Sequence, residues 1–164
     1  MPGVLFYSGP SLATLHEKYA KRGRIDDEAP VTSSSNMIID APVHQVWTVI
    51  SDVAGWPAWH APITVLELTT VRPDVPFRWK IGRAAIRSTF AIVDPDRELT
   101  WTGRFLGFKA VDRHLVGPVG TDRTRVTMTE SLAGPLLPLL YSSAKLRAGH
   151  ERWLADLKKK IENH

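Results

Sequence analysis

Alternating apolar and polar residues dominate the middle of the chain, from about residue 63 to residue 131. The alternation is regular over five segments, 77–81, 86–92, 99–105, 108–116 and 126–130. A period of two is typical of strands that bury one face. In the second segment it predicts that Ile86, Ser88, Phe90 and Ile92 share a face. Because short Pro- and Gly-containing turns separate the segments, we expect an antiparallel meander with one covered face.

The regions on both sides of this meander have other patterns. An extended stretch from 31 to 40 leads through Ala41-Pro42 into a short helix over 43–50, followed by a second turn over 53–59. After Gly134 and Pro135, a helical stripe predicts one long helix, with an interruption or restart near Pro138. The stripe consists of Leu139, Leu146, His150, Trp153, Leu157 and Ile161. The chain is therefore expected to be α+β.

Residues 1–30 form a separate N-terminal extension in this interpretation, and 31–164 form the main domain. Ser11 is a candidate N-cap, and Leu12, Leu15, His16 and Tyr19 then recur at helical spacing until about Gly23. A helix this short is marginally stable alone, so we expect it to dock on the main domain or on a second subunit. The second case would make the protein a homodimer.

The composition of the chain excludes several classes of protein. The chain has 164 residues, a net charge of +4 and no cysteine, which fits one globular domain without disulfides or cysteine metal sites. No apolar run is long enough to span a membrane, and the first residues lack a secretory pattern, so a cytoplasmic location is expected. Basic and acidic residues alternate along the chain, and no nucleotide-binding or short metal-ligand motif is present. We expect no nucleic acid partner, no metal and no cofactor.

Several short motifs accompany this order of elements: 37–47 (MIIDAPVHQVW), 56–59 (WPAW), 77–80 (FRWK), 86–89 (IRST), 94–95 (DP), 99–103 (LTWTG) and 124–127 (TRVT). Together, the motifs and their order resemble the polyketide cyclase/dehydrase-type branch of the START-like (SRPBCC) superfamily over residues 31–162. The resemblance implies the helix-grip fold, in which an antiparallel sheet wraps around a long C-terminal helix. It also implies a cavity between them that takes a lipid, sterol, polyketide or other apolar ring system.

Aromatic and aliphatic residues on the expected covered faces are candidates for binding such a ligand. Six tryptophans are many for 164 residues, and flat aromatic walls suit a ligand with rings. The alternative is that they only fill the core. The candidate ligand-binding residues are Trp59, Trp79, Ile86, Phe90, Trp101, Phe105, Met128, Leu139, Leu146, His150 and Trp153.

Three polar residues also fall on the covered face: Asp112, His114 and Glu130. Two carboxyl groups and an imidazole in one cavity are candidates for general acid–base catalysis. The alternatives are a salt-bridged cluster, or a register shift of one residue that turns all three outward. Three functions therefore remain open: a binding protein for a small apolar ligand, a polyketide cyclase/dehydrase-type enzyme, and a non-catalytic interaction module with a filled or collapsed cavity.

Overall fold

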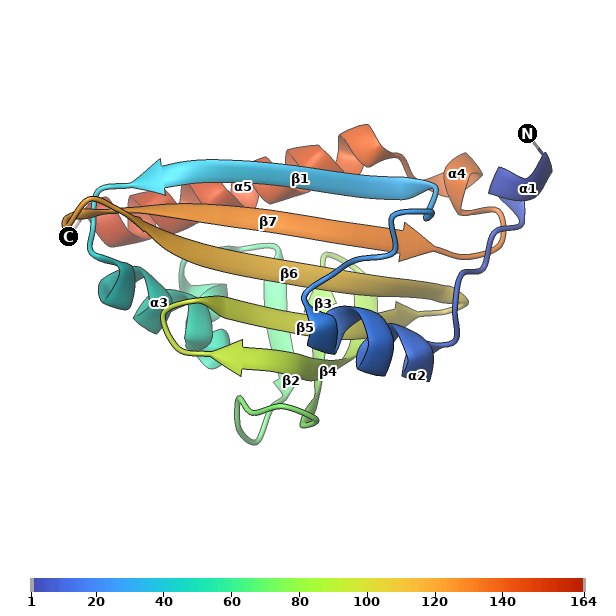
Figure 1. Ribbon diagram of the computed structural model, residues 1–164, viewed down its shortest axis with the longest axis horizontal. Coiled ribbons are helices and arrows are strands. Elements are labelled where there is room, and N and C mark those ends of the chain that lie inside the picture. The colour runs from blue at the N-terminus through green and yellow to red at the C-terminus, as the bar shows by residue number, and fades with distance from the viewer. Residues whose placement is uncertain (1, 164) are drawn as a thin grey trace.

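The computed structural model describes residues 2–163, and these form one seven-stranded antiparallel sheet with a long helix across one face (Figure 1). The strand order is β1-β7-β6-β5-β4-β3-β2. The strands are β1 (Val31–Ile39), β2 (Ile63–Glu67), β3 (Pro76–Ile81), β4 (Ala84–Asp94), β5 (Glu98–Phe105), β6 (Phe108–Val119) and β7 (Arg123–Ala133). The helices of the main domain are α3 (Val43–Ser51), the 3₁₀ helix η3 (Val53–Ala58), α4 (Leu137–Leu140) and α5 (Ser143–Glu162). The expected helix-grip α+β fold is confirmed.

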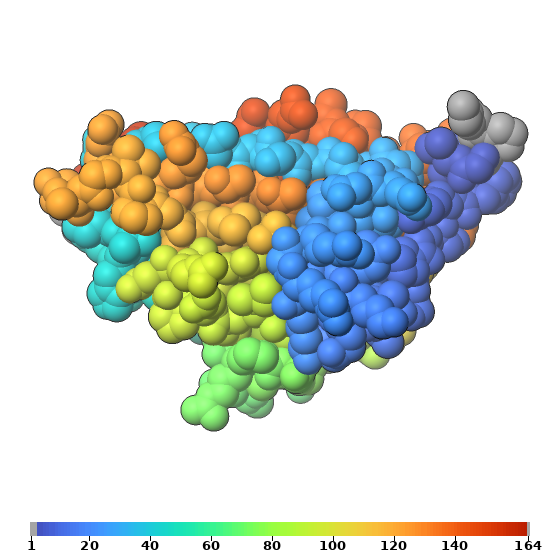
Figure 2. Space-filling view, in the orientation of Figure 1, coloured from blue at the N-terminus to red at the C-terminus, as the bar shows by residue number. Residues whose placement is uncertain are grey.

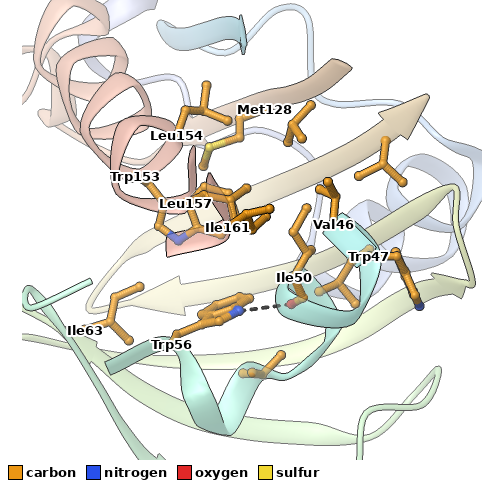
Figure 3. Close-up of a cluster of buried hydrophobic side chains, with 14 of the residues drawn as sticks. Val46, Trp47, Ile50, Trp56, Ile63, Met128, Trp153, Leu154, Leu157 and Ile161 are labelled. Carbon is orange, nitrogen blue, oxygen red and sulfur yellow. Dashed lines mark hydrogen bonds between the residues drawn. The ribbon is translucent and has the colours of Figure 1, made fainter. Parts of the chain in front are cut away.

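Helix α5 supplies one side of the main core. Its side chains Trp153, Leu154, Leu157 and Ile161 are buried against the sheet and α3, as Figure 3 shows. Ser142 caps the helix, because its side-chain oxygen accepts a hydrogen bond from the Lys145 backbone N–H. This cap separates α5 from α4, so the predicted interruption near Pro138 divides the region into two helices.

The predicted faces of the strands follow from the observed register. Trp101 on β5 lies opposite Asp112 on β6, and Asp112 lies opposite Glu130 on β7. One segment differs from the prediction. A β-bulge between Phe90 and Ile92 pairs Ile92 with Thr100 instead of continuing the face of Phe90. The placement of Ile92 on the covered face was therefore wrong, because the extra residue of a bulge reverses the alternation beyond it.

Most of the N-terminal segment packs on the sheet face opposite α5. It contains α1 (Pro2–Leu5), α2 (Leu12–Thr14), the π-helical turn η1 (Leu15–Tyr19) and the 3₁₀ turn η2 (Ala20–Arg22), which ends at Gly23 with φ of 68°. Leu15 and Ala20 pack against the sheet, and His16 Nδ1 lies 2.8 Å from Thr102 Oγ1. Figures 1 and 2 show this blue segment lying across the sheet. The turns α2, η1 and η2 lie on this face, whereas α1 contacts α4, and the Leu136 backbone N–H donates a hydrogen bond to the Leu5 carbonyl oxygen.

Membrane insertion by a helix is not indicated. Within residues 2–163, no helix combines the length and apolar character that crossing a bilayer requires.

Candidate functional site

A cavity of about 450 Å³ lies between the sheet and α5. Most of its wall is apolar, and the cavity opens to solvent where the turn between β5 and β6 approaches α4. Leu106 in that turn and Leu140 in α4 both border the cavity, yet they are 81% and 64% exposed. A concave, mostly apolar pocket of this size is typical of small-molecule sites.

Tryptophan and histidine rings form the inner end of the cavity. The His114 ring stacks on Trp101 with centroids 4.7 Å apart, and Trp153 meets the same imidazole edge-on at 4.8 Å. Trp56 packs 5.5 Å from Trp101 and 5.9 Å from Trp153. Its indole N–H donates a 3.0 Å hydrogen bond to the Ile50 carbonyl, which fixes this ring against the end of α3 (Figure 3). The aromatic wall is therefore rigid and already formed.

Four polar residues share one region of this wall: the buried Asp112, His114 and His150, and the partly buried Glu130. The strand register places the Asp112 and Glu130 carboxyl groups side by side, with oxygen atoms within 4.8 Å of each other. His150 reaches them from α5, with its Nε2 atom 2.8 Å from Glu130 Oε1. Ligand atoms of Asp112, Glu130 and His150 all lie within 4.8 Å of one another. Two strands and a helix thus bring three titratable groups together.

Burial determines the charge of this cluster. It raises the pKa of Asp112 well above the usual range, and the adjacent Glu130 carboxyl raises that pKa further. Burial also raises the pKa of Glu130 to about 8. The two imidazoles shift in the opposite direction: burial lowers the pKa of His114 to about 3 and lowers the pKa of His150 below its ordinary value. At neutral pH the Glu130 carboxyl group is therefore largely protonated and the two imidazoles are neutral.

Three atoms of this cluster lack hydrogen-bond partners within residues 2–163: Asp112 Oδ1, His114 Nδ1 and His150 Nδ1, of which the first two lie 3.6 Å apart, just beyond hydrogen-bond distance. Buried polar atoms without partners are costly and are uncommon in native proteins. All three residues line the cavity, so a ligand hydroxyl or carbonyl group could supply the missing partner. The cluster combines one polar contact region with an otherwise apolar wall.

The same carboxylates and His150 have enough ligand atoms for one divalent cation. A metal-binding histidine usually donates its second ring N–H to a carboxylate or carbonyl. The Nδ1 atom of His150 has no such partner among the described residues. Proton sharing between the two carboxyl groups therefore fits the observed geometry better than a metal.

Most of the residues selected from the sequence border the cavity. They are Trp79, Ile86, Trp101, Phe105, Met128, Leu146, His150 and Trp153, together with Asp112, His114 and Glu130.

Three selected residues do not border it, for three reasons. Phe90 stacks on Phe77 at 4.1 Å and is buried in the core behind the wall. Trp59 follows η3 and packs against Trp153 at 5.2 Å, outside the cavity. Leu139 is 69% exposed, because α4 is separate from α5 and does not continue its buried stripe.

Sequence reasoning also missed several lining residues, including Trp56, Leu137 and Tyr141. Trp56 belongs to a motif that was already noted, but its direction depends on the irregular turns of η3. Leu137 and Tyr141 flank the break between α4 and α5, where no simple period applies. His60 is buried and lies 2.7 Å from the Asp156 carboxylate on α5.

A family model described as polyketide cyclase / dehydrase and lipid transport matches residues 30–162, nearly the whole main domain. The chain belongs to this family. Comparison with curated proteins gives no match. Proteins that share one fold can have unrelated activities, so membership of the family does not identify the ligand of the cavity.

Solved structures show the same fold as this polyketide cyclase/dehydrase family chain, at low sequence identity. A START superfamily protein from Mycobacterium smegmatis matches with a TM-score of 0.69 and 17% identity, covering 80% of this chain and 97% of its own. The Zhui aromatase/cyclase from Streptomyces sp. R1128 matches with a TM-score of 0.64 and 15% identity, covering 80% and 93%. Truncated norcoclaurine synthase from Thalictrum flavum matches with a TM-score of 0.65 and 15% identity, covering 81% and 94%.

Proposed function

We propose that the protein binds a small, mainly apolar molecule with one or more rings in the cavity between the sheet and α5. The observation that carries this proposal is the rigid aromatic wall formed by Trp56, Trp79, Trp101 and Trp153 around an open cavity of about 450 Å³. Planar rings gain dispersion and stacking energy on such a wall without requiring matched charge. The family and the fold support a hydrophobic ligand or a cyclase-type substrate.

The cluster of Asp112, His114, Glu130 and His150 indicates which polar groups the ligand carries. Protonated carboxyl groups donate hydrogen bonds, and neutral imidazoles both donate and accept them. A ligand that carries a hydroxyl or carbonyl group on an apolar ring system would satisfy the unpartnered atoms of Asp112, His114 and His150. The third initial hypothesis, a non-catalytic interaction module, required a filled or collapsed cavity, and the open cavity favours ligand binding over it.

Filling the cavity from β6 tests this proposal. Ala110 borders the cavity, whereas Ala85 on β4 is exposed between two cavity residues and serves as the control. After expression and gentle purification, native mass spectrometry should detect an organic molecule bound to the wild type and to Ala85→Trp. We expect Ala110→Trp to lose it, because the added indole occupies the ligand volume. Equal amounts of the molecule on all three proteins would place it outside the cavity.

The acid pair supports a second candidate function, catalysis of a cyclase or dehydratase type. In this scheme the protonated Glu130 carboxyl donates its proton to a carbonyl or departing hydroxyl oxygen of the substrate. The neutral His150 imidazole accepts a proton from the substrate, and Asp112 stabilises the Glu130 carboxylate that forms. With its low pKa, His114 stays neutral and orients the substrate by a hydrogen bond. Such assistance contributes typically about 10²–10⁴-fold to a rate.

A charge-neutral substitution tests the catalytic candidate. With an aromatic polyketide as substrate, we expect Glu130→Gln to lower kcat by at least about 100-fold, because glutamine cannot transfer a proton. Binding of the same substrate should weaken by less than about tenfold, because glutamine keeps the size and hydrogen-bonding capacity of the neutral acid. Unchanged turnover in Glu130→Gln would remove the acid from the mechanism.

A further inference from the structure

Four basic residues form one row across the sheet face opposite the cavity. Arg78 on β3 lies directly opposite Arg87 on β4, Arg87 lies opposite Arg104 on β5, and Arg104 lies opposite Lys109 on β6. Their neighbours Trp79, Ser88 and Gly103 line the cavity, so the alternation of strand side chains directs the basic row to the outer face. Arg78, Arg87 and Arg104 are exposed.

Only one of the four basic residues forms an ion pair within residues 2–163. Like charges directly opposite each other on neighbouring strands are destabilising. Arg78 pairs with Glu67, its Nη1 atom lying 3.5 Å from Glu67 Oε2. Arg87 and Arg104 have no ion pair or side-chain hydrogen bond within residues 2–163. The repulsion between these two arginines is therefore not compensated by the protein itself.

A hollow adjoins the arginines. It has a volume of about 430 Å³ and lies between Leu12 of the N-terminal segment and strands β3 to β5. Besides Leu12, the hollow is lined by all three arginines, by Pro76, Phe77, Ser88 and Thr89, and by one acidic residue, Glu67, which pairs with Arg78. The arginines thus border a concavity with apolar residues beside it, which gives an organic anion both charged and apolar contacts.

Both ends of the row are closed to a longer anion. Glu67 lies at the β2 side, where its carboxylate pairs with Arg78. At the other end, the Lys109 ammonium group donates a hydrogen bond to the Pro10 carbonyl oxygen and lies under the N-terminal segment. A polynucleotide would have to pass one of these ends, whereas a short anion fits between them.

The distance between the arginines indicates which kind of short anion would fit between them. Neighbouring strands lie about 4.8 Å apart, so the three arginine backbones span about 10 Å. A guanidinium group can bind two oxygens of a phosphate group at once. Several arginines in a row therefore suit an anion whose charge is distributed over two phosphate groups. We propose that Arg78, Arg87 and Arg104, with the adjacent hollow, bind the diphosphate group of a small organic molecule. Arg104 and Ser88 border both this hollow and the cavity between the sheet and α5, so the two sites adjoin each other.

Isothermal titration calorimetry with inorganic pyrophosphate tests this proposal on the full chain. We expect one binding site per chain, and at least tenfold weaker binding in Arg87→Gln. Arg125 on β7 is exposed and lies outside the row, so Arg125→Gln is the control that removes the same charge. It should bind pyrophosphate within twofold of the wild type. Arg87→Lys keeps the charge but not the bidentate geometry, and should bind with intermediate affinity.

Three results would overturn the proposal. Equal losses in Arg87→Gln and Arg125→Gln would mean that pyrophosphate senses only net charge. Inorganic phosphate or sulfate binding as tightly as pyrophosphate at equal ionic strength would reject the diphosphate class. A single-stranded oligonucleotide that binds more tightly than pyrophosphate and depends on Arg87 would assign the row to nucleic acid. Circular dichroism and an unchanged unfolding transition would show that the variants remain folded.

Discussion

Replacing Trp56 with alanine is expected to lower the free energy of unfolding by about 4 kcal/mol, within the range for large-to-small changes in a core. The side chain is 1% exposed and contacts rings from β5 and α5, and its indole N–H bonds the Ile50 carbonyl. Alanine would leave a void where α3, the sheet and α5 meet, as well as an unpaired carbonyl oxygen. Urea unfolding followed by circular dichroism measures the loss.

Trp59→Ala is the matched control, because Trp59 lies three residues later and is only half-buried. It contacts Trp153 at 5.2 Å but borders neither the cavity nor the centre of the core. We expect its loss of stability to be less than half that of Trp56→Ala, in proportion to the apolar area it buries. If the two substitutions lowered the free energy of unfolding equally, Trp56 would not be the residue that joins α3, the sheet and α5.

Raising the pH from 6.5 to 8 is expected to destabilise the wild type, and Glu130→Gln should remove about 2 kcal/mol of that loss. Burial raises the pKa of Glu130 to about 8 in the folded protein, whereas an unfolded glutamate ionises near 4.5. Between these values the folded state binds more protons, so stability falls as the pH rises. The lowered pKa values of His114 and His150 act in the opposite direction, but only below the ordinary histidine value of 6.5.

Urea unfolding at both pH values, for wild type, Glu130→Gln and Glu151→Gln, isolates this contribution. Glu151 is exposed on α5, so Glu151→Gln should follow the wild type. Burial also raises the pKa of Asp112, which is present in all three proteins. An equal pH dependence in Glu130→Gln and wild type would mean that Glu130 is ionised in the folded protein.

The polar cluster could be predicted from the sequence because strand alternation has a period of two. Once Trp101 was assigned to the covered face, the short turns placed Asp112, His114 and Glu130 on the same face. The observed register brings Asp112 and Glu130 directly opposite each other. His150 was placed on the buried stripe of the last helix, but only the packing of α5 on the sheet shows that it reaches Glu130.

Other features depend on interactions that a local pattern does not contain. The bulge in β4 reverses the direction of Ile92 without any glycine or proline to mark it. The break between α4 and α5 turns Leu139 to the solvent, because Tyr141 adopts an extended conformation before the Ser142 cap. The predicted single helix after Ser11 is a succession of α, π and 3₁₀ turns, which fits Leu15, His16 and Ala20 onto the sheet. In each case tertiary packing decides the local conformation.

The central claim, that the cavity binds an apolar ring compound, is tested most directly by titrating 2-naphthol into three proteins. Its fused rings match the aromatic wall, and its hydroxyl group can reach the cluster around Asp112 and Glu130. Calorimetry should give one site per chain in the wild type and in Ala85→Trp, and at least tenfold weaker binding in Ala110→Trp. Equal affinity in all three proteins, or no saturable binding to the wild type, would contradict the account.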